Sequence, residues 1–186
     1  DTLALVPRGE MRPALPLLHA EYGDDSTPRV LLCGVDTVYF SFMLEVSDAI
    51  WERLEASQQE AKDYDQTGKK AYIPEWLGVV LAPMGAKGGY RFRLEHPDFS
   101  IKLIKGVPNR PGIYVEMRAF ALHVHPGGAL GACEAACQFI RDVLLSDWDI
   151  AQAARMVNLE EALCSRLDLH CDWQGGWQPT YTTGED

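Results

Sequence analysis

The alternation of hydrophobic and polar residues along the chain predicts a set of β-strands. The pattern is clearest over residues 90–95 and 99–105, where apolar side chains fall on every second position. His96-Pro97-Asp98 lies between these two segments and is typical of a turn, so we expect them to form a hairpin. Residues 112–124 alternate in the same way and predict one long strand. The β-branched and aromatic residues of 30–44 predict the first strand of the domain.

Hydrophobic residues at helical spacing predict two main helices. Ser47 is the expected N-cap of the first, with Asp48 in its first turn, and this helix is expected to end near Asp65. Residues 129–145 predict the second, and their many small side chains would let it lie close to a sheet. A short third helix is expected over residues 147–157.

The order of these elements is strand, helix, a group of strands, helix, and a last strand over residues 163–173. It predicts an α+β fold: a single mixed, mostly antiparallel sheet with the two main helices on one face. This arrangement resembles the ferredoxin-like or RNA-recognition-like sandwich, enlarged by extra strands. We expect residues 1–28 to be a poorly ordered lead-in, 29–175 to be a single α+β domain, and 176–186 to be a flexible tail.

Charge and cysteine usage narrow the range of partners. With 27 acidic and 17 basic residues the net charge is −10, which argues against a general polyanion-binding surface. Nucleic-acid binding would therefore require a local basic patch or a missing basic partner domain. The five cysteines include no C-x-x-C pair, so neither a zinc ribbon nor a disulfide framework is indicated. Reduced thiols, no recognisable signal peptide and no apolar run near the roughly 18 residues of a membrane span predict a cytoplasmic protein without a membrane partner.

The last predicted strand carries the strongest candidates for metal-binding or catalytic side chains. Side chains two apart on a strand face lie roughly 6.5 to 7 Å apart, so Asp168 and Asp172 are expected to flank His170 on one row. Two carboxylates and an imidazole suit a hard divalent cation such as Mg²⁺ or Mn²⁺, which would polarise a phosphate. The alternative is a solvated sheet face with an Arg166–Asp168 pair. The opposite face is expected to be dry and holds Leu163, Ser165, Leu167, Leu169, Cys171 and Trp173.

A second candidate is the His–hydrophobe–His pair formed by His123 and His125 at the end of the predicted long strand. This pattern resembles the metal site of the HUH class of DNA-nicking enzymes. Those enzymes also need a Tyr on a downstream helix, whereas the next Tyr here is Tyr181, in the tail. The alternative is a pair of surface or hydrogen-bonded histidines. A metal cluster that joins both to Asp168 and His170 would require the two strands to be neighbours.

Basic residues around the predicted hairpin are the candidates for nucleic-acid binding. They are expected to share its exposed face, and aromatic residues interleave with them. A charged sheet face with neighbouring aromatic rings suits single-stranded nucleic acid. The alternative is that the aromatic rings point into the core and the charges only confer solubility. The basic candidates are Arg91, Arg93, Lys102 and Lys105, with Arg110 and Arg118 nearby, and the aromatic residues are Tyr90, Phe92 and Phe99.

Three segments carry a family resemblance: residues 34–42 in the first strand, residues 115–118 before a helix, and residues 165–172 in the last strand. Together they resemble the rolling-circle replication initiators of plasmids and filamentous phages (the Rep_trans type) and the related relaxases. In that family an Arg-x-Asp-x-x-x-Asp strand is followed by a second half-domain whose Tyr attacks the DNA phosphate. Acidic residues of the family hold the metal.

Arg166, Asp168 and Asp172 match that strand motif position by position. The resemblance implies that these are the catalytic residues, that Asp168 and Asp172 hold Mg²⁺ or Mn²⁺ with His170 assisting, and that the partner is DNA. The family's Tyr-bearing segment does not follow Asp172, and Tyr181 sits in no matching motif. The resemblance therefore implies an amino-terminal portion that lacks a carboxy-terminal domain or partner chain.

The sequence thus predicts a DNA-binding, strand-nicking replication initiator, or a fragment of one. Whether the chain by itself is an endonuclease or relaxase stays open. Two alternatives also stay open. One is a non-enzymatic protein-interaction or assembly module, which suits the acidic charge. The other is a His/Asp metal-dependent phosphodiester hydrolase.

Overall fold

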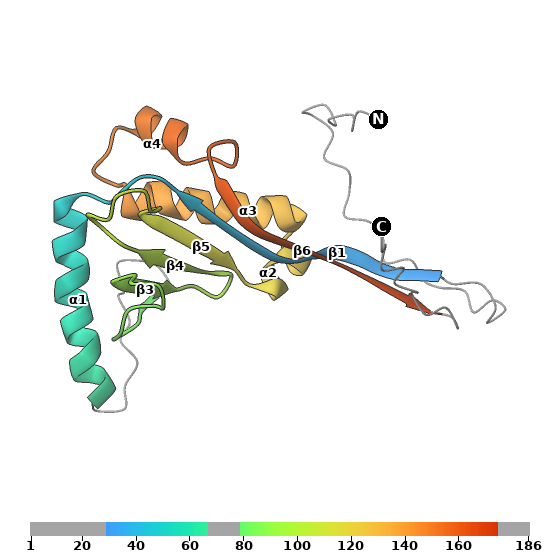
Figure 1. The fold of residues 1–186 in the computed structure, drawn as a ribbon, viewed down its shortest axis with the longest axis horizontal. Coiled ribbons are helices and arrows are strands. Elements are labelled where there is room, and N and C mark those ends of the chain that lie inside the picture. The colour runs from blue at the N-terminus through green and yellow to red at the C-terminus, as the bar shows by residue number, and fades with distance from the viewer. Residues whose placement is uncertain (1–28, 67–78, 175–186) are drawn as a thin grey trace, which may run out of the picture. The chain divides into compact units, whose positions relative to one another are not determined.

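A computed structural model describes residues 29–66 and 79–174 of the chain (Figure 1). The predicted lead-in and tail lie outside the described residues, as do the side chains of 29–33, 64–66 and 171–174. The elements are β1 (Arg29–Phe42), α1 (Asp48–Gln66), β2 (Val80–Leu81), β3 (Phe92–Glu95), β4 (Phe99–Leu103), β5 (Ile113–Met117), α2 (Ala119–Val124), α3 (Gly128–Phe139), a π-helical turn η2 (Ile140–Leu144), α4 (Ile150–Met156) and β6 (Leu163–Gln174).

Contacts divide the chain into two compact units. The main unit is Val35–Asp168 and holds all of these helices together with β2 to β5. The second unit comprises residues 1–34 and 169–186, and its described part consists of the outer residues of β1 and β6.

The strands form one six-stranded sheet in the order β2-β3-β4-β5-β1-β6. The predicted hairpin is confirmed, because β3 and β4 pair antiparallel with Phe92 opposite Leu103. The ladders between β4 and β5 and between β5 and β1 are antiparallel as well. The fold class is therefore α+β, as predicted, and β1 lies between β5 and β6 rather than beside β2, the next strand in the chain.

Period-two alternation builds the core. On β3 and β5 the buried residues occupy alternate positions, and on β4 Phe99, Ile101 and Leu103 are buried together with Ser100. The hydrophobic residues among them pack into one cluster with both main helices. Helix α1 contributes Ile50 and Leu54, and α3 contributes Ala132 and Ala136, each under 6% exposed. The small side chains of α3 allow the close approach to β5 that Figure 1 shows.

Local capping explains where two helices begin. The predicted N-cap of α1 is confirmed, since the Ile50 backbone N–H donates to the Ser47 hydroxyl oxygen at 3.2 Å. Helix α4 begins in the same way, with the Gln152 N–H donating to the Asp149 carboxylate at 3.0 Å. The predicted second and third helices are also present, as α3 with η2 and as α4.

The predicted long strand through Val124 is wrong in its second half. β5 ends at Met117, and α2 follows after Arg118, whose backbone is extended. The His125 N–H donates to the Ala121 carbonyl at 3.1 Å, as in a helical turn. Consecutive Ala121 and Leu122 are both buried, which helical geometry permits and strand alternation does not. The high helix propensity of alanine and leucine favours this outcome.

The predicted dry face of the last strand is also not dry. Within the main unit, Leu163 and Leu167 of β6 are 50% and 55% exposed. Leu169, in the second unit, is 73% exposed. The reason is position: β6 is the outermost strand beside β1, whereas the buried cluster is built on β3, β4, β5 and the inner end of β1.

Candidate nucleic-acid interface

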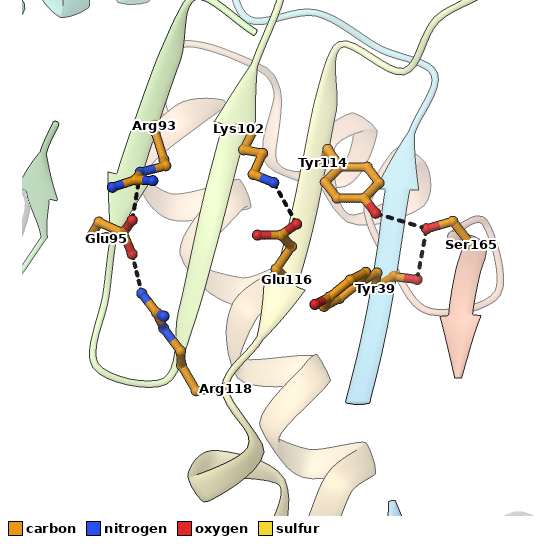
Figure 2. A network of polar contacts seen from close by, with 8 residues as sticks. All are labelled: Tyr39, Arg93, Glu95, Lys102, Tyr114, Glu116, Arg118 and Ser165. Carbon is orange, nitrogen blue, oxygen red and sulfur yellow. Dashed lines mark hydrogen bonds and ion pairs between the residues drawn. The ribbon is translucent and has the colours of Figure 1, made fainter. Parts of the chain in front are cut away.

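One face of the sheet carries polar and aromatic side chains instead of helices. Figure 2 shows these residues on the side of the strands that faces away from the helical ribbons behind them. On β1, β3 and β5 alternation places them there, because the residues next to them in sequence, such as Phe40, Phe92 and Val115, point into the core. Ser165 lies on the outer strand β6. Register then aligns them across strands, with Tyr39 opposite Glu116 and Lys102 opposite Tyr114.

Three tyrosines form a row on this face. The ring centroids of Tyr39 and Tyr114 are 6.2 Å apart, and those of Tyr114 and Tyr90 are 5.8 Å apart. All three side chains are partly exposed. These spacings lie within the range of favourable aromatic pairs, so the rings stabilise one another while part of each stays accessible.

Each ring of the row has a cationic side chain over it. The Arg166 guanidinium lies 5.4 Å from the centroid of Tyr39, and the Lys102 ammonium lies 5.4 Å from that of Tyr114. Arg110 lies 5.3 Å from the Tyr90 centroid. We call these three tyrosines and three cations the tyrosine face. It combines flat rings, on which bases can stack, with positive charges that attract phosphates.

The hydroxyl groups tie the row to β6. The Ser165 hydroxyl oxygen lies 3.2 Å from the Tyr114 hydroxyl and 3.3 Å from the Tyr39 carbonyl oxygen (Figure 2). Serine has one hydroxyl proton, so the consistent arrangement is that Ser165 donates to the carbonyl and Tyr114 donates to Ser165. This chain of hydrogen bonds joins β5 to β6 across β1.

Ion pairs cover the rest of this sheet face. The Arg93 Nε lies 2.7 Å from a Glu95 carboxylate oxygen, and Glu95 also pairs with Arg118 (Figure 2). Lys102 pairs with Glu116. Because acids and bases alternate, the face is not acidic even though the chain carries a net charge of −10. The ion pairs also hold Lys102 in place near the Tyr114 ring.

The predicted basic patch is only partly assembled. Arg93 and Lys102 are cross-strand partners on β3 and β4 and share this face, as expected. Lys105 instead pairs with Asp48 of α1, and its ammonium lies 5.9 Å from the ring centroid of Trp51.

Of the predicted aromatic residues of the hairpin, likewise only some lie on this face. Phe92 and Phe99 are buried in the core, as the alternative interpretation held, and the Arg91 guanidinium lies 5.7 Å from the Phe92 ring centroid. Tyr90 alone of the three predicted aromatic residues joins the tyrosine face.

On β6, Arg166 and Asp168 form the ion pair that the alternative interpretation described. The Arg166 Nε donates to a carboxylate oxygen of Asp168 at 2.8 Å. This hydrogen bond lowers the pKa of Asp168, and it raises the pKa of Arg166 above its ordinary value. Both groups are solvent-exposed, so the pair contributes little to stability. His170 and Asp172 belong to the second unit, and the Asp172 side chain lies outside the described residues. The metal site predicted for this strand therefore stays a prediction.

The two candidate histidines do not sit on a strand. His123 lies in α2 and His125 follows its last residue, so the strand-borne pair typical of HUH enzymes is not formed. His125 is a hydrogen-bonded histidine, because its Nδ1 accepts from the Gly127 N–H at 3.1 Å. His123 instead lies near β1, with a ring nitrogen within 4.8 Å of a carboxylate oxygen of Asp36. The hydrolase interpretation placed these histidines on a strand beside the last one, whereas they lie in and just after α2, so that interpretation stays a prediction.

Sequence reasoning missed Tyr39, Tyr114 and Ser165 as members of a site. From the sequence, the aromatic residues of the first strand indicate only strand formation, and Tyr114 is placed only on the face opposite Ile113. The available signal was that both tyrosines occupy the polar parity of their strands, out of phase with Phe40 and Val115.

Comparison of the chain with protein-family models, with curated proteins and with solved structures found no match in any of the three. Among the helices of the described residues, none has the length and apolar character needed to cross a membrane.

Proposed function

We propose that this chain binds single-stranded DNA on its tyrosine face and is the amino-terminal part of a cytoplasmic, strand-nicking replication initiator. The observation that carries the DNA-binding part is the row of Tyr39, Tyr114 and Tyr90 with a cation over each ring. Stacking on sheet-borne aromatic rings, with arginine and lysine beside them, is how many proteins hold unpaired bases.

The same geometry favours single strands over duplex DNA. Bases in a duplex are stacked on one another, so their faces cannot reach rings that lie on a sheet. Duplex binding depends mainly on positive charge, and this chain carries −10 overall. If the three cations of the tyrosine face each neutralise one phosphate, log K should fall with log salt with a slope of roughly −2.

Fluorescence anisotropy with a labelled oligothymidine tests this part. Wild type is expected to bind the single strand and to bind the matching duplex much more weakly. Tyr39→Ala and Tyr90→Ala should each weaken single-strand binding by roughly 5- to 150-fold, the effect of losing one base–ring stack. Phe120→Ala is the matched control, because Phe120 is an aromatic residue that is 71% exposed on α2. Equal affinities for both DNA forms, or an equal loss in the control, would contradict the proposal.

The nicking part rests on the resemblance of Arg166, Asp168 and Asp172 to the initiator motif. We propose that Asp168, Asp172 and His170 would hold Mg²⁺ or Mn²⁺, which would polarise the phosphate to be cleaved. Asp168 fits this role only in part. Its depressed pKa keeps it ionised, but Arg166 bonds one of its oxygens and would have to be accommodated beside the cation.

Calorimetric titration of Mn²⁺ into wild type and Asp168→Ala tests the metal separately from DNA binding. Binding should be present in wild type and lost in the variant, while Asp147→Ala, an exposed carboxylate before α4, serves as the control. Equal Mn²⁺ binding by all three proteins would remove the metal role. A nicking assay on single-stranded DNA with Mn²⁺ then reports whether the chain cleaves by itself.

A non-enzymatic binding or assembly module is the second candidate. The exposed leucines of β6 favour it, because apolar side chains on an outer strand are typical of protein contacts. Single-strand binding without Mn²⁺ binding or nicking would support this second function over the first.

A further inference from the structure

The two edges of the sheet differ in how well they are protected. One edge is β2, which is only two residues long. The other is β6, with twelve residues. Among the described residues, no strand pairs with the outer side of β6. Very short strands, prolines and charged side chains, lysine above all, are the usual means of blocking an exposed edge. β6 contains neither proline nor lysine, and its charged residues are Arg166, Asp168 and Asp172.

The side chains of β6 are also unusual for a strand that ends at solvent. Leu163 and Leu167 are about half exposed, and Cys164 is exposed. A strand edge that no described strand pairs with, together with exposed leucines, is the combination that pairs readily with another strand.

The charge pattern of β6 indicates which strand would pair with its outer edge. Leu167 lies between Arg166 and Asp168, two opposite charges that are both exposed to solvent. When two copies of a strand pair antiparallel about a two-fold axis at one residue, the residue before it faces the residue after it in the partner. With the axis at Leu167, Arg166 of each copy faces Asp168 of the other.

We propose that two copies of this chain associate by antiparallel pairing of their β6 strands about a two-fold axis at Leu167. The two leucines then meet at the axis, and two Arg–Asp pairs flank them. Opposite charges that face each other across antiparallel strands are favourable, whereas like charges in those positions are unfavourable. Within one copy Arg166 already bonds Asp168, and because both side chains are exposed they can share these contacts with the second copy. The proposal does not depend on DNA binding.

Sedimentation velocity over a range from low to several hundred micromolar protein tests the association. Wild type is expected to shift from monomer to dimer as concentration rises, with no larger species, because each copy offers one β6 edge. Arg166→Asp places like charges opposite each other at both flanking positions and should weaken the dimer by at least about tenfold. Asp168→Arg should have the same effect for the same reason.

The double variant Arg166→Asp with Asp168→Arg is the decisive comparison. It restores opposite charges across the axis, so the dimer should return to near wild-type strength. Arg155→Asp, the same charge change at an exposed position on α4, should leave the dimer unchanged. Circular dichroism and urea midpoints confirm that each variant is folded. A wild type that stays monomeric, larger assemblies, a double variant as weak as the single ones, or an equal loss in Arg155→Asp would each overturn the proposal.

Discussion

Replacing Tyr114 by phenylalanine or by leucine separates the ring of this residue from its hydroxyl group. The hydroxyl bonds Ser165 at 3.2 Å, while the ring contacts Tyr39, Tyr90 and Lys102. Tyr114→Phe removes only the hydrogen bond. Tyr114→Leu removes the ring as well and keeps an apolar side chain on the strand.

The two variants should differ in stability. A hydrogen bond contributes about 0.5–1.5 kcal/mol, and the Tyr114→Phe loss should lie near the lower value because Ser165 is exposed and water can replace its partner. Tyr114→Leu also loses two aromatic pairs of about 0.5–1.5 kcal/mol each and a cation–π contact of about 0.5–1 kcal/mol. The sum is roughly 2–5 kcal/mol, an upper bound because neighbouring side chains close up around the leucine.

Urea denaturation measures these differences, provided that the slope of the unfolding free energy with urea stays constant. Binding of an oligothymidine measures the functional part on the same proteins. Tyr114→Phe should bind within about twofold of wild type, because the ring that stacks on a base remains. Tyr114→Leu should bind roughly 5- to 150-fold more weakly. If Tyr114→Phe loses as much affinity as Tyr114→Leu, the hydroxyl and not the stacked ring is what contacts DNA, and the argument from the tyrosine row fails.

Three further predictions concern the fold. Gly112→Ala should destabilise the protein by roughly 1–3 kcal/mol in urea, because a Cβ there would lie 2.2 Å from the Leu44 carbonyl oxygen, and an unchanged midpoint would show that the backbone can yield. Burial lowers the pKa of His96 from its ordinary value of 6.5, so below that pH the unfolded chain binds more protons than the folded one. The free energy of unfolding should therefore fall as the pH drops below 6.5. In His96→Gln this part of the pH dependence should disappear from the unfolding curves. Burial raises the pKa of Cys137 to about 12, so a brief alkylation pulse at neutral pH followed by peptide mapping should label Cys164 and leave Cys137 unmodified unless the fold opens locally.

Local patterns in the sequence were sufficient to find most of the fold. The hairpin between β3 and β4, the Ser47 cap of α1 and the helix of small residues that became α3 all depend on neighbouring positions in the chain. The end of the strand that became β5 is predicted too late because Ala119 to Val124 is an almost wholly apolar segment, which is compatible with a strand and also has strong helix propensity. Burial of the adjacent Ala121 and Leu122 decided between the two, and burial is a property of the folded chain.

The tyrosine face could not be predicted in the same way. Tyr39 and Tyr114 are far apart in the sequence, and they meet because β1 inserts between β5 and β6 in the sheet. Strand order and register are set by long-range packing, and a shift of one residue would send both rings into the core. The sequence places Arg93 and Lys102 correctly on neighbouring strands, whereas Arg91 and Lys105 lie just outside β3 and β4. Only the folded chain shows that Lys102 lies beside a tyrosine while Lys105 pairs with α1.

Strand order, which long-range packing sets, also explains why side chains of β6 are exposed, and this exposure bears on function. Alternation correctly predicted a strand with leucines on one face, and this pattern normally means that a core covers that face. In this sheet β1 already borders the core, so about half of each of Leu163 and Leu167 on the next strand stays exposed. An apolar pattern that a single chain leaves exposed is explained if a second chain covers it. The Arg166–Leu167–Asp168 sequence is self-complementary, because in a two-fold antiparallel pairing each charge faces its opposite, and this is why a copy of the same chain is the proposed partner.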